Sequence, residues 1–148
     1  RDRSNFVFHM PIGQKDGSGE WEQLWWEQVG ELRFVLCCIP FFVYDLSLGD
    51  EVETNEEHVV LSIIKRSGQA PFRVWLGDQD EDTKTKAMDN IQLLNPLVEW
   101  SSPNLVALSI EEASALDLSS VLRSLEDRGY LHYETGAKRS FRRNDSSL

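Results

Sequence analysis

Residues 72–94 read FRVWLGDQDEDTKTKAMDNIQLL, and within this stretch the hydrophobic pattern of the chain changes its period. The first five residues are apolar except for Arg73, which predicts a strand over 72–76. After an acidic turn, apolar residues recur at spacings of four and three from Ala87 to Leu94. This spacing predicts a helix, with Asp82 or Thr83 at its N-cap.

The remainder of the second half alternates short apolar strands with one further helix. Strands are expected over 98–101, 105–110 and 130–134. Asp117 is expected to cap the helix, and Gly129 is well placed to end it. The resulting order β-α-β-β-α-β is the arrangement of a ferredoxin-like sandwich.

The first half of the chain shows period-two alternation and tight turns. Strands are expected over 6–10, 21–29, 32–38, 51–54 and 58–65. The second of these also fits a helical face, but its three tryptophans favour a strand. Several short strands joined by tight turns are typical of a small barrel.

Together these patterns predict an α+β protein in three parts. Residues 1–70 are expected to form a β-rich, barrel-like subdomain, and residues 71–136 the ferredoxin-like subdomain. Residues 137–148 are polar and basic and are expected to form a flexible tail. The full length of 148 residues is sufficient for a stable hydrophobic core without disulfides or metals.

The charge distribution indicates the kind of partner. The net charge is −10, but four basic residues fall within the tail, so residues 1–136 carry a net charge of −13. No lysine or arginine occurs between Arg33 and Lys65, where six acidic residues gather. Such a field repels nucleic acid and anionic membranes and attracts basic proteins. Acidity that serves solubility alone is the competing interpretation.

The candidate binding residues combine these acids with aromatic side chains. Alternation places Trp21 and Trp25 on one face of their strand and Trp26 on the other, so one set could be exposed. Exposed tryptophans supply much of the contact energy at interfaces. The predicted partner-binding residues are Asp45, Asp50, Glu51, Glu53, Glu56, Glu57, Trp21 and Trp25.

No residue pattern points to catalysis, a metal or a cofactor. His9, His58 and His132 each lie in a predicted strand and lack a second ligand at metal-binding spacing. Cys37 and Cys38 have no neighbouring base or cation to lower a thiol pKa. The acids from Asp78 to Asp82 lack the ligand spacing and glycine of a calcium loop. We therefore expect a protein that is not an enzyme.

The chain also resembles a family of uncharacterised bacterial proteins, known as domain of unknown function number four-two-six-five. The resemblance covers residue 6 to about 135 and consists mostly of turn and core residues. Because no catalytic residues are assigned in that family, it implies a fold and no active site. It rests on Leu24-Trp25, Ile39-Pro40-Phe41-Phe42, Leu48-Gly49-Asp50 with Val52, Arg66-Ser67-Gly68, Phe72-Arg73-Val74 and Leu105-Val106-Ala107-Leu108.

Three functions compete on this basis, and an enzyme of unrecognised type is the least favoured of them. The first is an immunity or antitoxin protein that neutralises a basic bacterial toxin domain through its acidic surface. The second is a regulatory module that binds a small molecule or peptide in a groove between the two subdomains. Adjacent reduced cysteines and the absence of an apolar run of ~20 residues favour the cytoplasm, with neither nucleic acid nor membrane as partner.

Overall fold

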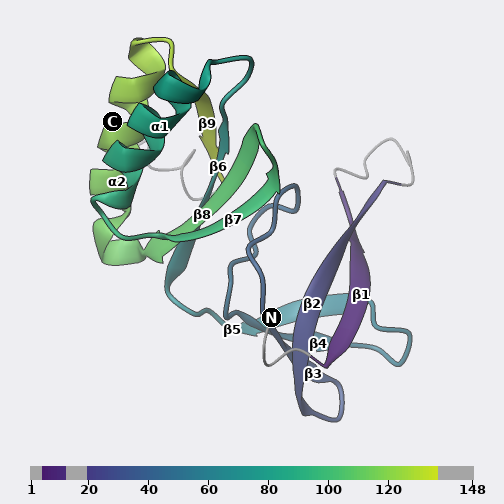
Figure 1. Cartoon of the computed structure of the whole chain (residues 1–148). Helices are drawn as coiled ribbons and strands as arrows, with labels where there is room; N and C mark the ends of the chain where they lie inside the picture. Colours follow the sequence, from purple (N-terminus) through teal and green to yellow (C-terminus); the bar gives the residue numbers. More distant parts are fainter. Residues whose placement is uncertain (1–4, 13–19, 137–148) are drawn as a thin grey trace, which may run out of the picture.

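The computed structural model describes residues 5–12 and 20–136, which form two antiparallel sheets and two α-helices (Figure 1). The expected basic tail, residues 137–148, lies outside the described residues. The fold is therefore α+β, as the sequence predicts. Neither described helix has the length and apolar character needed to cross a lipid bilayer.

The first sheet follows the order of the chain. Its five strands are β1 (Phe6–Pro11), β2 (Trp21–Gly30), β3 (Arg33–Leu36), β4 (Glu51–Thr54) and β5 (Val60–Lys65), paired in sequence. Alternation turns Phe8, Trp26 and Phe34 inward, where they pack together, and Phe8 stacks on Trp26 at 4.6 Å between ring centroids. Among the described strands β1 and β5 remain edges, so the sheet is a half-barrel and not a closed barrel.

The edge strand β5 is irregular at two points. Its pairing with β4 shifts register at Leu61 and again at Ile64, which leaves each of these residues as an extra residue of a β-bulge. Both side chains are exposed. The β2–β3 pair has one further irregularity between Gln28 and Gly30, beside the turn.

The second sheet has the strand order β7-β8-β6-β9. Its strands are β6 (Gln69–Trp75), β7 (Leu97–Ser102), β8 (Leu105–Glu111) and β9 (His132–Thr135), and each pair is antiparallel. The helices α1 (Glu81–Gln92) and α2 (Ala115–Asp127) cover one face, turned away from the first sheet (Figure 1). The core between helices and sheet includes Phe72, Val74, Ile91, Val106, Leu108, Leu118 and Leu122.

The helix ends correct two of the expected caps. The carboxylate of Asp80, not Asp82 or Thr83, caps α1 by accepting the Thr83 N–H at 2.8 Å. A short 3₁₀ turn, η2 (Glu112–Ser114), leads into α2, so this helix begins two residues before Asp117. Gly129 follows α2 with φ of +80°, a conformation that favours glycine, as expected.

Residues 37–50 form a long loop between the two sheets, where the sequence predicts a strand that continues to residue 38. The strand β3 ends at Leu36, and the chain then leaves the sheet. Cys38, Val43 and Leu46 fill the inner side of the half-barrel. The N–H of the buried Ile39 points instead to Glu99 on β7, at 3.4 Å from its carboxylate. This loop, residues 37–50, is therefore the packing layer between the two sheets.

We predict that Leu46→Ala lowers the free energy of unfolding by roughly 2–5 kcal/mol, because it removes a buried side chain from the loop that the half-barrel packs against. The measurement is urea denaturation followed by tryptophan fluorescence. Leu93→Ala is the matched control, since Leu93 is 82% exposed and its loss should cost less than about 0.5 kcal/mol. Equal effects of the two substitutions would contradict the packing role of the loop.

Candidate functional site

A buried arginine is the most unusual polar group among the described residues. Arg73 lies in β6, flanked by Phe72 and Val74, and its side chain is only 4% exposed. Because neighbouring residues on a strand face opposite ways, Arg73 points away from the helices and toward the loop, residues 37–50. Its Nε donates to the Pro40 carbonyl at 3.3 Å, and its Nη2 donates to the carbonyl of Val43.

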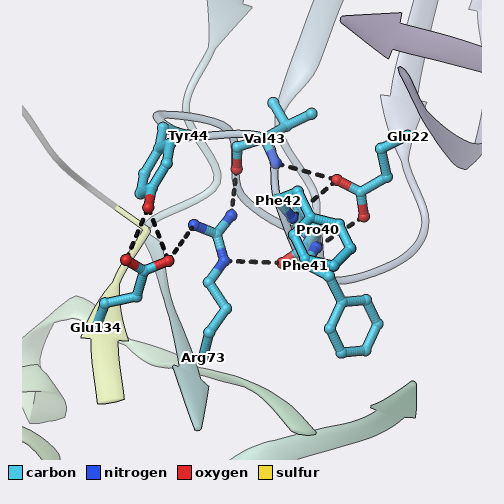
Figure 2. Close-up of polar contacts among 8 residues, drawn as sticks. All are labelled: Glu22, Pro40, Phe41, Phe42, Val43, Tyr44, Arg73 and Glu134. Atoms are coloured by element: carbon cyan, nitrogen blue, oxygen red, sulfur yellow. Dashed lines mark hydrogen bonds and ion pairs between the residues drawn. The ribbon is translucent and has the colours of Figure 1, made fainter. Parts of the chain in front are cut away.

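Glu134 and Tyr44 complete the surroundings of this guanidinium (Figure 2). The carboxylate of Glu134, on β9, lies 3.6 Å from Nη1 of Arg73 and accepts a hydrogen bond of 2.7 Å from the Tyr44 hydroxyl. The Tyr44 ring lies 4.7 Å from the guanidinium carbon. Burial lowers the pKa of Arg73, and the negative charge of Glu134 opposes that shift. Burial also raises the pKa of Tyr44, reinforced by its hydrogen bond to Glu134.

Glu22 holds the same loop from the other side. Its carboxylate accepts three consecutive backbone N–H groups, from Phe41 at 2.7 Å and from Phe42 and Val43 at 3.0 Å. Figure 2 shows the loop held between Glu22, from the half-barrel, and Arg73, from the second sheet. Glu22 therefore satisfies three consecutive N–H groups of this turn, and Arg73 satisfies the carbonyls of Pro40 and Val43.

Asp50 has a structural role of the same kind, which corrects its prediction as a surface residue. It is fully buried and accepts the N–H groups of Ser47 at 2.9 Å and Ser67 at 2.8 Å. Arg66 donates to it at 3.1 Å and also donates to the carbonyl of Asp45, at 2.7 Å. This carboxylate connects the end of the loop to Ser67 and Arg66. Because it is enclosed, it is not available to a partner.

The other predicted acids lie in three places. Glu51 and Glu53 lie on the outer surface of the half-barrel, beside a hollow of about 370 Å³. Glu56 and Glu57 are exposed at the tip of the β4–β5 hairpin. Asp45 lies in the loop, where its N–H donates to the carbonyl of Gly136. We call the lining of the hollow the acidic face; it comprises Val29, Gly30, Glu31, Leu32, Arg33, Glu51 and Glu53.

The tryptophans follow the predicted alternation, but they do not all reach the acids. Trp26 is fully buried, whereas Trp21 is 57% exposed and Trp25 is partly buried. Glu27 is level with Glu51 across β3, so Trp25 lies two residues from the acidic face along β2. Trp21 lies six residues from it, about 20 Å away. The structure therefore keeps Trp25 near the acidic face and separates Trp21 from it.

Sequence analysis does not single out Arg73, Glu22 or Glu134. The one available signal is a charged residue inside an apolar strand, Phe72-Arg73-Val74, which must find compensation when the strand is buried. The sequence pattern also does not identify Glu31, because it lies in a turn far from Glu51 in sequence. Cys37 and Cys38 are unbridged thiols. Within residues 5–12 and 20–136, no group of three or more His, Cys, Asp or Glu side chains is arranged to hold a metal ion.

The comparisons with known proteins identify the family. A family model described as domain of unknown function (DUF4265) matches residues 22–133, and this range contains the loop, Glu22, Arg73 and the acidic face, whereas Glu134 lies one residue beyond it. The chain belongs to the DUF4265 family. This agrees with the resemblance that the turn and core residues suggest.

A solved structure has a fold similar to that of this DUF4265 chain. It is described as a novel crystal structure of a hypothetical protein from Neisseria gonorrhoeae, and it aligns with a TM-score of 0.75 at 18% identity. The alignment covers 88% of this chain and 93% of that chain. At this identity the likeness concerns the fold alone. No curated protein matches the sequence.

We predict that Arg73→Met lowers the free energy of unfolding by about 3 kcal/mol, because two buried carbonyls lose their donor. Glu134→Gln should cost less than about 1 kcal/mol, since Glu134 is 52% exposed. The amide oxygen of the introduced glutamine can still accept the hydrogen bond from the Tyr44 hydroxyl. Guanidinium denaturation of both variants measures the difference. A greater loss of unfolding free energy in Glu134→Gln than in Arg73→Met would show that the ion pair, and not the carbonyl contacts, holds the loop.

We predict that Asp50→Ala is also destabilising, by roughly 3 kcal/mol, because the buried N–H of Ser47 and the partly buried N–H of Ser67 lose their acceptor and Arg66 loses its ion pair. The matched control is Glu53→Ala, an exposed acid on the adjoining strand, with an expected effect within about 0.5 kcal/mol. Thermal unfolding of the two variants separates a structural acid from a surface acid.

Proposed function

We propose that this chain is a non-enzymatic protein-binding protein, an immunity or antitoxin protein that neutralises a basic bacterial toxin domain. The observation that carries the proposal is the acidic face. Three carboxylates, of Glu31, Glu51 and Glu53, surround one hollow, and Glu56 and Glu57 extend the charge to the hairpin tip. The face contains a single cation, Arg33, at 3.9 Å from Glu51.

The acidic face also offers apolar contact area. Val29 is 49% exposed beside the β2–β3 turn, and Leu32 is partly buried in the lining of the hollow. Charge at the rim of an interface mainly sets the association rate, whereas desolvated apolar contacts contribute more of the affinity. A basic surface with one projecting apolar side chain matches this combination.

The alternative, a module that binds a small molecule or peptide between the subdomains, receives less support. That proposal needs an open groove between the two parts. The loop, residues 37–50, occupies this position and bonds to both sheets through Glu22 and Arg73. We therefore favour a partner that binds on the outer surface.

Two further assignments accompany the proposal. We propose that the second unit is a ferredoxin-like sandwich, supported by the element order β6-α1-β7-β8-α2-β9 and by the sheet order β7-β8-β6-β9. We also place the protein in the cytoplasm, supported by its unbridged cysteines. A crystal structure tests the first, and fractionation of the native cells tests the second.

Co-expression with the products of neighbouring genes tests the proposed function. We expect one neighbour to be a toxic, basic protein, and we expect the wild-type chain to restore growth and to bind that protein directly. Failure to neutralise any neighbouring toxic product, with the chain folded and expressed, would contradict the proposal.

With that partner, Glu53→Lys, Glu56→Lys and Glu57→Lys together should reduce the association rate constant about tenfold or more at low salt. The exposed acids Asp89, Glu111 and Asp127 lie on the second unit, so converting all three to lysine gives a control with the same change in net charge. The measurement is stopped-flow association at two salt concentrations. An equal decrease of the association rate constant in both triple variants would mean that the net charge of the chain governs binding, and not the position of the acids on the half-barrel.

A further inference from the structure

We propose that the second unit carries a separate docking surface, which binds an arginine side chain of a basic protein partner. This surface, the Trp75 patch, lies on the face of the second sheet opposite the helices and comprises Trp75, Leu105, His132 and Glu134. The acidic face belongs to the half-barrel, so the Trp75 patch goes beyond the proposed function and does not depend on it.

The strand register places the four side chains of the patch next to one another. Trp75 is directly opposite Leu105 on β8 and His132 on β9. Directly paired residues of antiparallel strands project from the same face, and Trp75 shares that face with Arg73, two residues before it. Because Glu134 is paired with Arg73, it is a diagonal neighbour of Trp75, about 7–8 Å away. One long side chain of a partner can therefore contact both.

The loop, residues 37–50, covers only part of this sheet face. Arg73, which is bonded to the loop, is 4% exposed. Two residues further along β6, Trp75 is 47% exposed, and the paired Leu105 is half-buried. Tryptophan is enriched at protein interfaces and among the residues that dominate their binding energy. The patch is thus an aromatic surface that begins where the loop ends.

The charges around Trp75 favour a cation as the bound group. The strands β6, β8 and β9 are described in full, and Arg73 is the only lysine or arginine on them. Its guanidinium is buried, whereas Glu134 is 52% exposed and Asp78, three residues after Trp75, is also exposed. These carboxylates repel phosphate groups. Nucleic acid is therefore a poor occupant, although its bases can stack on tryptophan.

Arginine fits this combination better than lysine does. A planar guanidinium can stack on an indole ring and, in its own plane, donate to a carboxylate. Glu134 lies 3.6 Å from Nη1 of Arg73 and accepts from the Tyr44 hydroxyl at 2.7 Å (Figure 2). Its two oxygens offer about four lone pairs, so acceptor capacity remains for a second guanidinium. The ammonium group of lysine is a compact point charge that lacks the stacking plane.

An NMR titration of the full chain tests the Trp75 patch with a defined probe. The probe is a glycine–arginine–glycine peptide with both ends blocked, and its counterparts carry lysine or uncharged citrulline in place of arginine. We expect the arginine peptide to produce saturable shifts of the Trp75 indole signal and of the amides of residues 132–134. Its dissociation constant should be about two- to fivefold lower than that of the lysine peptide. The citrulline peptide should bind more weakly than the arginine peptide.

The variant Trp75→Thr removes the indole ring, and Trp100→Thr is its matched control. The two tryptophans are 47% and 49% exposed. Trp100 is paired with Val106, which packs against the helices, so it lies on the opposite face of the same sheet. Trp75→Thr should abolish the saturable shifts at residues 132–134, whereas Trp100→Thr should leave the dissociation constant unchanged. Glu134→Gln should raise that constant about twofold or more.

Three results would overturn the Trp75 patch: shifts confined to residues 29–33 and 51–53, equal losses of binding in both tryptophan variants, or equal binding of the arginine and lysine peptides. If Trp75→Thr does not fold, an unchanged dissociation constant in Glu134→Gln overturns it instead. All of these results would leave the proposed function standing, because the effect of Glu53→Lys, Glu56→Lys and Glu57→Lys on partner association is measured separately.

Discussion

A guanidinium that is buried between two sheets must have its charge and its donors compensated, and this requirement organises the centre of the molecule. Arg73 finds two carbonyl oxygens in one short turn of the loop, at Pro40 and Val43. The N–H groups of the same turn find their acceptor in Glu22. An unpaired charge in this position would be far more costly than an unpaired amide. Residues from both sheets therefore bind the same turn of the loop, and these contacts connect the two sheets.

Much of the fold could be predicted from periodicity alone. The second unit follows its hydrophobic pattern closely, because its helices each have one buried side and its central strands, β6 and β8, are short runs buried on both faces. The exceptions lie at element ends, where local chemistry has several solutions. Asp80, Asp82 and Thr83 can all cap a helix, and only the path of the chain selects Asp80. The start of α2 is similar, since a 3₁₀ turn extends the helix beyond the cap that the sequence suggests.

The loop and the candidate site are harder to predict for a physical reason. Irregular backbone has no period, so residues 37–50 offer no repeating signal beyond an apolar composition. Charge also gives no indication of burial. Asp50 and Glu51 are adjacent acids, yet one is enclosed by backbone donors and the other borders an open hollow. Their difference depends on Arg66, Ser67 and Arg33, which only tertiary structure brings close. The match to the DUF4265 family assigns no role to any of these residues.

The bulges of β5 have a consequence for the behaviour of the protein in a crowded cell. An open half-barrel exposes the unpaired backbone of its last strand, and a regular apolar edge can recruit strands from other molecules. At Leu61 and Ile64 the extra residues interrupt the even spacing of backbone donors and acceptors along this edge. A passing strand would find matching hydrogen-bond partners over only one or two residues before losing register. At its β5 edge the half-barrel can thus remain open while offering a poor template for fibril growth.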